Sequence, residues 1–184
     1  MNVRLGGTLA LLITLSACTK AAYVADGPLA RPLTQFNRID VRAITNKAPA
    51  MPATSETPPP PADKFVQTFR LDLTNRLLRK KVLHYASGPM LILEAALLKY
   101  RCESRSPSYE RDILVFQGTI EVEIALSDES GKRIGGGKAV MTAPGSTPEL
   151  AMKEAQKKIV ASIGDYIKKS ARGSEPDPPG SDDP

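Results

Sequence analysis

The stretch GTIEVEIALSDESGKRI, residues 118–134, contains the pattern that decides the fold. Its apolar residues recur at every second position, which is typical of a strand with one buried and one wet face. We expect this strand to cover residues 112–127. Residues 128–131 favour a turn, and residues 132–142 return as a second strand, so the stretch predicts an antiparallel β-hairpin. The alternating apolar residues are Ile120, Val122, Ile124 and Leu126.

Helical periodicity appears on both sides of this hairpin. Residues 147–149 combine a capping hydroxyl, a proline at the first helical position and a negative charge in the first turn. This combination predicts a helix start, and the helix should end before Gly173. An earlier helix is predicted over residues 62–83. The apolar stripes are Phe65, Phe69, Leu73 and Leu77 in the earlier helix, and Ala151, Ala155, Ile159, Ile163 and Ile167 in the later one.

Two further strands complete the predicted fold. Residues 36–44 alternate apolar Ile39, Val41 and Ala43 with polar residues, and the apolar run 90–101 follows a Gly-Pro pair, which favours a central strand over a helix. The order β-α-β-β-β-α predicts an α+β two-layer sandwich, a mixed four-stranded sheet with two helices on one face. The crossover makes the first two strands parallel, and the last three form an antiparallel meander.

The amino-terminal residues indicate export and lipidation. Arg4 precedes an apolar run, residues 9–15, that is too short to span a bilayer as a helix. Residues 15–18, Leu-Ser-Ala-Cys, resemble the lipobox of bacterial lipoprotein precursors. The resemblance implies cleavage of the signal peptide before Cys18, followed by attachment of diacylglycerol and an N-acyl chain of the palmitate type to that cysteine. Thr19 in place of Asp implies the outer membrane, on its periplasmic face; an ordinary secretory signal is the alternative.

This interpretation divides the chain into four parts. Residues 1–17 are the signal peptide, and residues 18–35 are a lipidated tether. Residues 36–172 form the periplasmic domain, with a proline-rich insertion at 45–61. Residues 173–184 form an acidic tail that is disordered by composition.

Basic residues on the two helices are candidate binding residues. The chain has a formal net charge of +5, yet its tail carries four acidic residues and no Lys or Arg, so the body is more basic than the whole. A basic body suits an anionic envelope surface such as lipid headgroups or lipopolysaccharide, although simple solvation of helix faces is the alternative. The candidates are Arg76, Arg79, Lys80, Lys81, Lys153, Lys157 and Lys158, and Lys168 and Lys169 extend the same surface.

The returning strand of the hairpin contains three consecutive glycines, Gly135, Gly136 and Gly137. A phosphate-binding loop is excluded, because Lys132 and Ala139 occupy positions where that motif needs Gly and Ser or Thr. Glycines within a strand indicate a bulge or a close backbone approach. The alternative is a bare strand that docks a partner by edge pairing, which adds the three glycines to the candidate binding residues.

Patterns for catalysis or metal binding do not occur in the sequence. The single histidine, His84, follows basic residues and is interpreted as a helix C-terminal cation. Glu121 and Glu123 share one face of a strand and are interpreted as solvated polar positions. Cys102 would be a half-buried thiol or, alternatively, form an intermolecular disulfide in the oxidising periplasm. We therefore expect no enzyme activity, metal or cofactor, and no nucleic-acid partner.

Several segments together resemble known envelope lipoproteins. They are the lipobox, the strand at 39–41, the pair of segments 118–122 and 126–131, and the helix start at 146–151. The chain resembles small lipoproteins of the domain-of-unknown-function 4410 type. Over about residues 36–172 it is also similar to the sheet-and-two-helix domains of the curli secretion lipoprotein and of the Tol-system propeller protein. The resemblance implies an accessory or assembly role in an envelope complex. Binding of lipopolysaccharide or peptidoglycan through the basic helices is the alternative.

Overall fold

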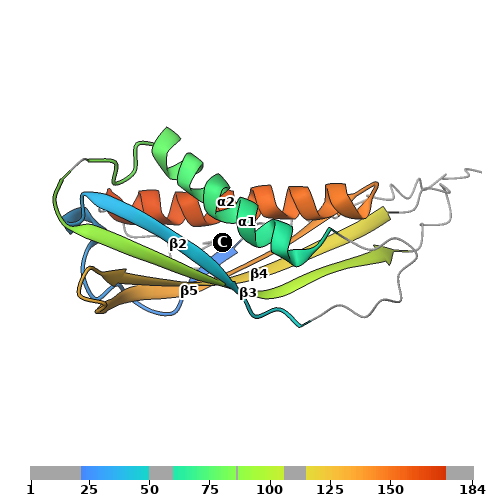
Figure 1. Ribbon diagram of the computed structural model, residues 1–184, viewed down its shortest axis with the longest axis horizontal. Coiled ribbons are helices and arrows are strands. Elements are labelled where there is room, and N and C mark those ends of the chain that lie inside the picture. The colour runs from blue at the N-terminus through green and yellow to red at the C-terminus, as the bar shows by residue number, and fades with distance from the viewer. Residues whose placement is uncertain (1–21, 50–59, 86, 106–114, 173–184) are drawn as a thin grey trace, which may run out of the picture.

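The computed structural model describes residues 22–49, 60–85, 87–105 and 115–172. In these residues five strands form one sheet, and two long helices cover the same face of it (Figure 1). The α+β class with two layers is confirmed. The elements are β1 (Ala22–Ala25), the 3-10 turn η1 (Leu33–Gln35), β2 (Arg38–Asn46), α1 (Ala62–Arg79), β3 (Met90–Arg105), β4 (Val115–Asp128), β5 (Arg133–Gly145) and α2 (Pro148–Ala171).

The sheet has the strand order β1-β5-β4-β3-β2. Strands β2 and β3 are parallel, as the helical crossover between them predicted, and β3, β4 and β5 form the predicted antiparallel meander. The prediction of four strands is wrong, because a fifth strand lies at the outer edge of β5. The predicted boundaries otherwise hold to within a few residues, although β3 and β5 both continue beyond their expected ends.

The fifth strand, β1, lies within residues 18–35, the range predicted to be a tether. It pairs antiparallel with β5, with Ala22 opposite Val140 and Ala25 opposite Gly137. Two more backbone hydrogen bonds, of 3.0 and 2.7 Å, continue the contact with β5 as far as Ala30. The alternative of a bare β5 edge is therefore wrong, because the chain's own amino-terminal segment occupies that edge.

The glycines of β5 make room for this amino-terminal segment. A Cβ atom at Gly137 would lie 2.7 Å from the hydroxyl of Tyr23, and one at Gly135 would lie 2.5 Å from the side chain of Leu29. The ring of Tyr23 packs against Tyr166 of α2, with ring centroids 4.0 Å apart. The interpretation of these glycines as a close approach is confirmed, and the approaching segment comes from the same chain.

The core lies between the helices and the sheet. The predicted apolar stripes of both helices and the alternating residues of β4 are buried, each with an exposed fraction of 2% or less. Strand β2 departs from the predicted alternation, because its register shifts between Val41 and Ile44. Val41 and Ile44 of β2 are buried on either side of this shift.

Local hydrogen bonds define the start of α2 and the end of α1. The hydroxyl of Thr147 accepts a hydrogen bond of 3.2 Å from the backbone N–H of Leu150, so the predicted cap of α2 is confirmed. Helix α1 ends at Arg79, earlier than the predicted residue 83. Lys81 there adopts a left-handed φ of 51°, and the N–H of Val82 donates back to the carbonyl of residue 77 at 3.0 Å. This pairing is a Schellman motif, which closes the helix.

The amino-terminal turn of α2 lies directly on two glycines of the sheet. A Cβ atom at Gly118 would lie 2.8 Å from the carbonyl of Ala151, and one at Gly145 would lie 2.8 Å from the Cα of the same residue. Ala151 is completely buried. Backbone packs on backbone here, so neither side has a flexible side chain that can move away.

We expect Gly145→Ala to lower the free energy of unfolding by about 2–3 kcal/mol, because the added methyl group overpacks this contact. Urea denaturation followed by circular dichroism measures the loss. Gly27→Ala is the matched control, since a Cβ atom there meets nothing within 4 Å. Equal stability of the two variants would contradict the packing argument.

The β4–β5 turn is organised by Asp128. Its Oδ1 accepts hydrogen bonds of 3.0 Å from the backbone N–H groups of Ser130 and Lys132, and its Oδ2 lies 3.4 Å from the guanidinium of Arg31. The hydroxyl of Ser130, followed by these backbone donors, holds the pKa of Asp128 below its usual value. The ionised carboxylate therefore stabilises the folded hairpin.

We expect Asp128→Asn to lower the urea midpoint at neutral pH. Because the pKa of Asp128 is lower in the folded state, its contribution is full above the unfolded value of about 3.9 and disappears as the pH falls through the folded value. The difference between the urea midpoints of the two proteins, measured at neutral pH and at about pH 3, gives the contribution of the ionised carboxylate. A gap of the same size at both pH values would disprove the role of ionisation.

Candidate functional site

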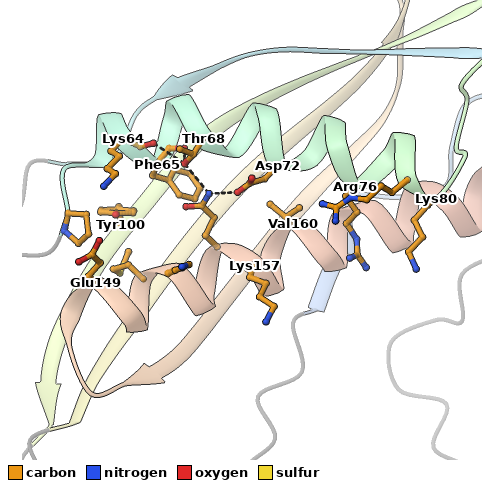
Figure 2. A pocket seen from close by; sticks show the side chains of 15 residues that line it. Lys64, Phe65, Thr68, Asp72, Arg76, Lys80, Tyr100, Glu149, Lys157 and Val160 are labelled. Atoms are coloured by element: carbon orange, nitrogen blue, oxygen red, sulfur yellow. Dashed lines mark hydrogen bonds between the residues drawn. The ribbon is translucent and has the colours of Figure 1, made fainter.

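A groove of about 670 Å³ lies between α1 and α2. Figure 2 shows side chains from both helices pointing into the space between them. Its apolar surface comes from Phe65 on α1, Tyr100 on β3, and Met152 and Val160 on α2. Phe65 belongs to the apolar stripe of α1, and the groove opens where this stripe, α2 and β3 meet.

The groove gathers five of the seven basic residues that the sequence analysis selected on the helices. Lys64, which was not predicted, also lines it. The two acidic lining residues are Asp72 and Glu149, so cations outnumber carboxylates around the groove. The five predicted residues are Arg76, Arg79, Lys80, Lys153 and Lys157.

The remaining predicted binding residues lie elsewhere. Lys81 lines a second hollow of about 400 Å³, together with Lys168 and Arg172 at the carboxyl end of α2. Lys158 is exposed and lines neither of these two hollows. Gly135 and Gly137 of β5 lie against the amino-terminal segment, and a Cβ atom at Gly136 would meet the carbonyl of Ile124 and the guanidinium of Arg133. The structure therefore assembles one basic surface from part of the predicted set.

One amide side chain joins the two helices across the groove. The Nε2 atom of Gln156 donates hydrogen bonds of 3.0 Å to the hydroxyl of Thr68 and 2.7 Å to Oδ2 of Asp72 (Figure 2). In Figure 2, Phe65 and Tyr100 lie toward one end of the groove, here called the aromatic end, and Lys64 and Glu149 lie at the same end. The opposite end, around Arg76, is here called the basic end.

Arg76 anchors the basic end. Its Nη2 donates hydrogen bonds of 2.9 and 3.0 Å to the two carboxylate oxygens of Asp165 on α2. Its stem lies flat over the backbone of α2, where a Cβ atom at Gly164 would lie 2.9 Å from the Cδ of Arg76. The Nε atom of Arg76 is buried without a hydrogen-bond partner among the described residues. Gly164 thus sets how closely the helices pack at this end.

The aromatic end supplies a neutral hydroxyl. Burial raises the pKa of Tyr100 to about 12, so its phenol stays protonated at neutral pH. Its ring packs against Phe65, with ring centroids 5.6 Å apart. This end offers aromatic surface next to Lys64 and Glu149, whereas the other end is basic. The groove thus combines aromatic and basic surface.

The residues that the sequence offered for catalysis or metal binding lie outside the groove. Within the described ranges no three His, Cys, Asp or Glu residues lie close enough together to hold a metal ion. His84 is exposed and stacks on Tyr85, and its Nδ1 lies 3.1 Å from the carbonyl of Lys81. Glu121 and Glu123 lie on the sheet face opposite the helices.

No helix in the described part of the chain is long and apolar enough to cross a membrane. The predicted lipidation site, Cys18, and the acidic tail at 173–184 lie outside the described residues.

No protein-family model and no curated protein sequence matches the chain. The solved structures that are similar to the chain include two of PelC. A PelC dodecamer from Paraburkholderia phytofirmans in space group P6 is 13% identical, with a TM-score of 0.47, over 78% of this chain and 94% of that one. A point variant of that dodecamer in space group C2 is 16% identical, with a TM-score of 0.44, over 78% and 93% of the two chains. Values this low transfer no role to this chain.

Cys102 lies near the end of β3 as a half-buried thiol, and its Sγ is 4.0 Å from the carbonyl oxygen of Pro148. Burial, with a smaller contribution from the charge of Glu103, raises the pKa of this thiol. The thiolate is the reactive form, so both its burial and its pKa oppose reaction at neutral pH.

In protein with Cys18→Ser, we expect Cys102 to react with iodoacetamide more slowly than an exposed thiol. The control is Ser104→Cys combined with Cys102→Ser, because Ser104 is exposed on the same strand. Mass spectrometry of timed samples gives both rates. Non-reducing gels of cells should show monomer, and a dimer that disappears in Cys102→Ser would instead establish the intermolecular disulfide.

Proposed function

We propose that this chain is a lipid-anchored, non-enzymatic accessory or assembly factor of an envelope complex at the bacterial outer membrane. Its folded domain is in the periplasm, and the groove between α1 and α2 holds a segment of its partner. The observation that carries the proposal is the groove itself, which joins an aromatic floor to a basic end between two well-packed helices.

The chemistry of the groove supports binding of an amphipathic segment. Met152 and Val160 offer apolar surface at its base, and Lys153 and Lys157 are exposed on its α2 side. A partner segment with apolar residues and carboxylates would bury its apolar residues against the floor of the groove. Its carboxylates would pair with the cations. The lipobox-like residues 15–18 support the anchor and the compartment.

A second candidate function is binding of an anionic envelope polymer or lipid, such as lipopolysaccharide or peptidoglycan. The charge around the groove favours it, because six basic residues and two acidic residues line the groove. Phosphates and carboxylates of such a ligand would pair with the cations. These pairs would lie near water, so binding would weaken strongly as the salt concentration rises.

We expect photo-crosslinking in living cells from benzoylphenylalanine at Lys153 to give a discrete product with an envelope protein. The matched control is the same probe at Arg101, an exposed residue on the opposite face of the sheet. The product should be lost in Lys80→Glu combined with Lys157→Glu, because these changes reverse charges around the groove. It should persist in Lys47→Glu combined with Lys132→Glu, which reverses the same number of exposed charges elsewhere.

The outcomes separate the two candidates. A protein product that depends on the groove charges supports the assembly role. Capture of only glycan or lipid, released by salt, supports the polymer-binding role instead. Equal crosslinking from Lys153 and Arg101 would reject the groove as the binding site in both.

A further inference from the structure

Strand β1 determines how far the folded domain can stand from an anchor at Cys18. Three residues separate Cys18 from Ala22, the first residue of β1. A fully extended chain advances at most about 3.6 Å per residue, so the Cα atoms of Cys18 and Ala22 lie within about 14 Å of each other. A tether that extended to residue 35 would reach about four times as far.

The amino-terminal segment is held firmly in the sheet. Besides the backbone pairing with β5, the hydroxyl of Tyr23 is completely buried, and the ring packs on Tyr166 of α2. The carboxylate of Asp26 forms an ion pair of 3.0 Å with Arg133 of β5. Release of β1 would expose the Tyr23 ring and the unpaired edge of β5. The short distance from Cys18 is therefore a property of the folded domain.

Exposed apolar side chains lie on the sheet beside this strand. Val24 of β1 is 51% exposed and Val140 of β5 is 46% exposed. Tyr23 points toward α2, so its neighbour Val24 points to the face of the sheet that the helices leave open. Val140 lies on the same open face, since it is opposite Glu121 of β4. Val140 is also directly opposite Ala22, the described residue closest to the anchor.

The central part of the open face differs from this apolar pair. From Lys99 to Glu103 of β3 and from Gln117 to Glu123 of β4 the outward positions are polar or charged, and Lys99 lies opposite Glu121. Val115, at the far end of β4, is an outward apolar residue and is 37% exposed. Beside the valines, Lys138 is opposite both Val24 and Glu123, so its charge is balanced locally. The outward residues of β3 and β4 include Lys99, Arg101, Glu103, Gln117, Thr119, Glu121 and Glu123.

We propose that Val24 and Val140 contact the surface of the lipid bilayer that carries the anchor. This inference rests on the proposed lipidation of Cys18. The short connection holds the β1–β5 edge at the membrane, where the two valines enter the boundary between headgroups and acyl chains. The anchor makes this contact intramolecular, so a small apolar surface suffices. The helices cover the opposite face, so the groove faces away from the membrane.

The test uses the full-length lipidated protein in vesicles of phosphatidylethanolamine and phosphatidylglycerol. A bimane fluorophore is attached to Val140→Cys in protein that also carries Cys102→Ser, and brominated lipids serve as quenchers. We expect loss of fluorescence at position 140 and no loss for the matched label on Lys153→Cys, on the helix side. Val24→Cys gives an independent second position on the same surface.

A second variant tests the short connection. A long Gly-Ser linker inserted between Ala21 and Ala22 leaves β1 intact and should abolish quenching at position 140. Quenching that persists with the linker, or equal quenching at positions 140 and 153, would overturn the proposed orientation. Mass spectrometry of the same samples shows whether Cys18 carries acyl chains. Lipidated protein without quenching at 140 refutes only this orientation, whereas a free Cys18 refutes the anchor itself.

Discussion

The structure depends on close backbone approach at a small number of glycines. At Gly118 and Gly145 the first turn of α2 lies directly on the sheet, and at Gly137 the ring of Tyr23 crosses β5. At Gly164 the stem of Arg76 lies against the backbone of α2. Together these contacts fix the position of α2 relative to both the sheet and α1. The groove has its width and its basic end because these positions carry no side chain.

Local patterns in the sequence predict the helices and strands whose apolar residues recur with the period of the element. The apolar stripe that includes Phe69 and the alternation that includes Val122 both have the period of their element, so they could be predicted without tertiary information. Strand β1 could not be predicted in this way. It has four residues, and its partner Gly137 lies 112 positions after Ala25. The glycines indicated that something approaches β5, but a glycine does not specify which segment approaches.

The candidate site was predictable to the extent that each helix carries its own cluster of cations. Arg76 and Lys153 were selected because of their helices, yet they line one groove only because α1 and α2 pack together. Lys81 is separated from them because α1 ends before it. Lys81 itself adopts the left-handed conformation, which no sequence pattern indicates. Gln156 and Tyr100 gain their roles from contacts between distant elements, and these contacts depend on the close packing of backbones.

The two faces of the sheet have different chemical characters, and this difference gives the molecule a direction. The helix face carries the groove, whereas the open face carries balanced charges and, at the β1 edge, the exposed valines. Because β1 pairs with β5, and because its Tyr23 packs against α2, the segment that leads to Cys18 is rigidly connected to the helix that forms half of the groove. An anchor attached there would orient the groove through the folded core, whereas a flexible tether would leave its direction free. The strand thereby links attachment at the membrane to the direction in which the binding surface is presented.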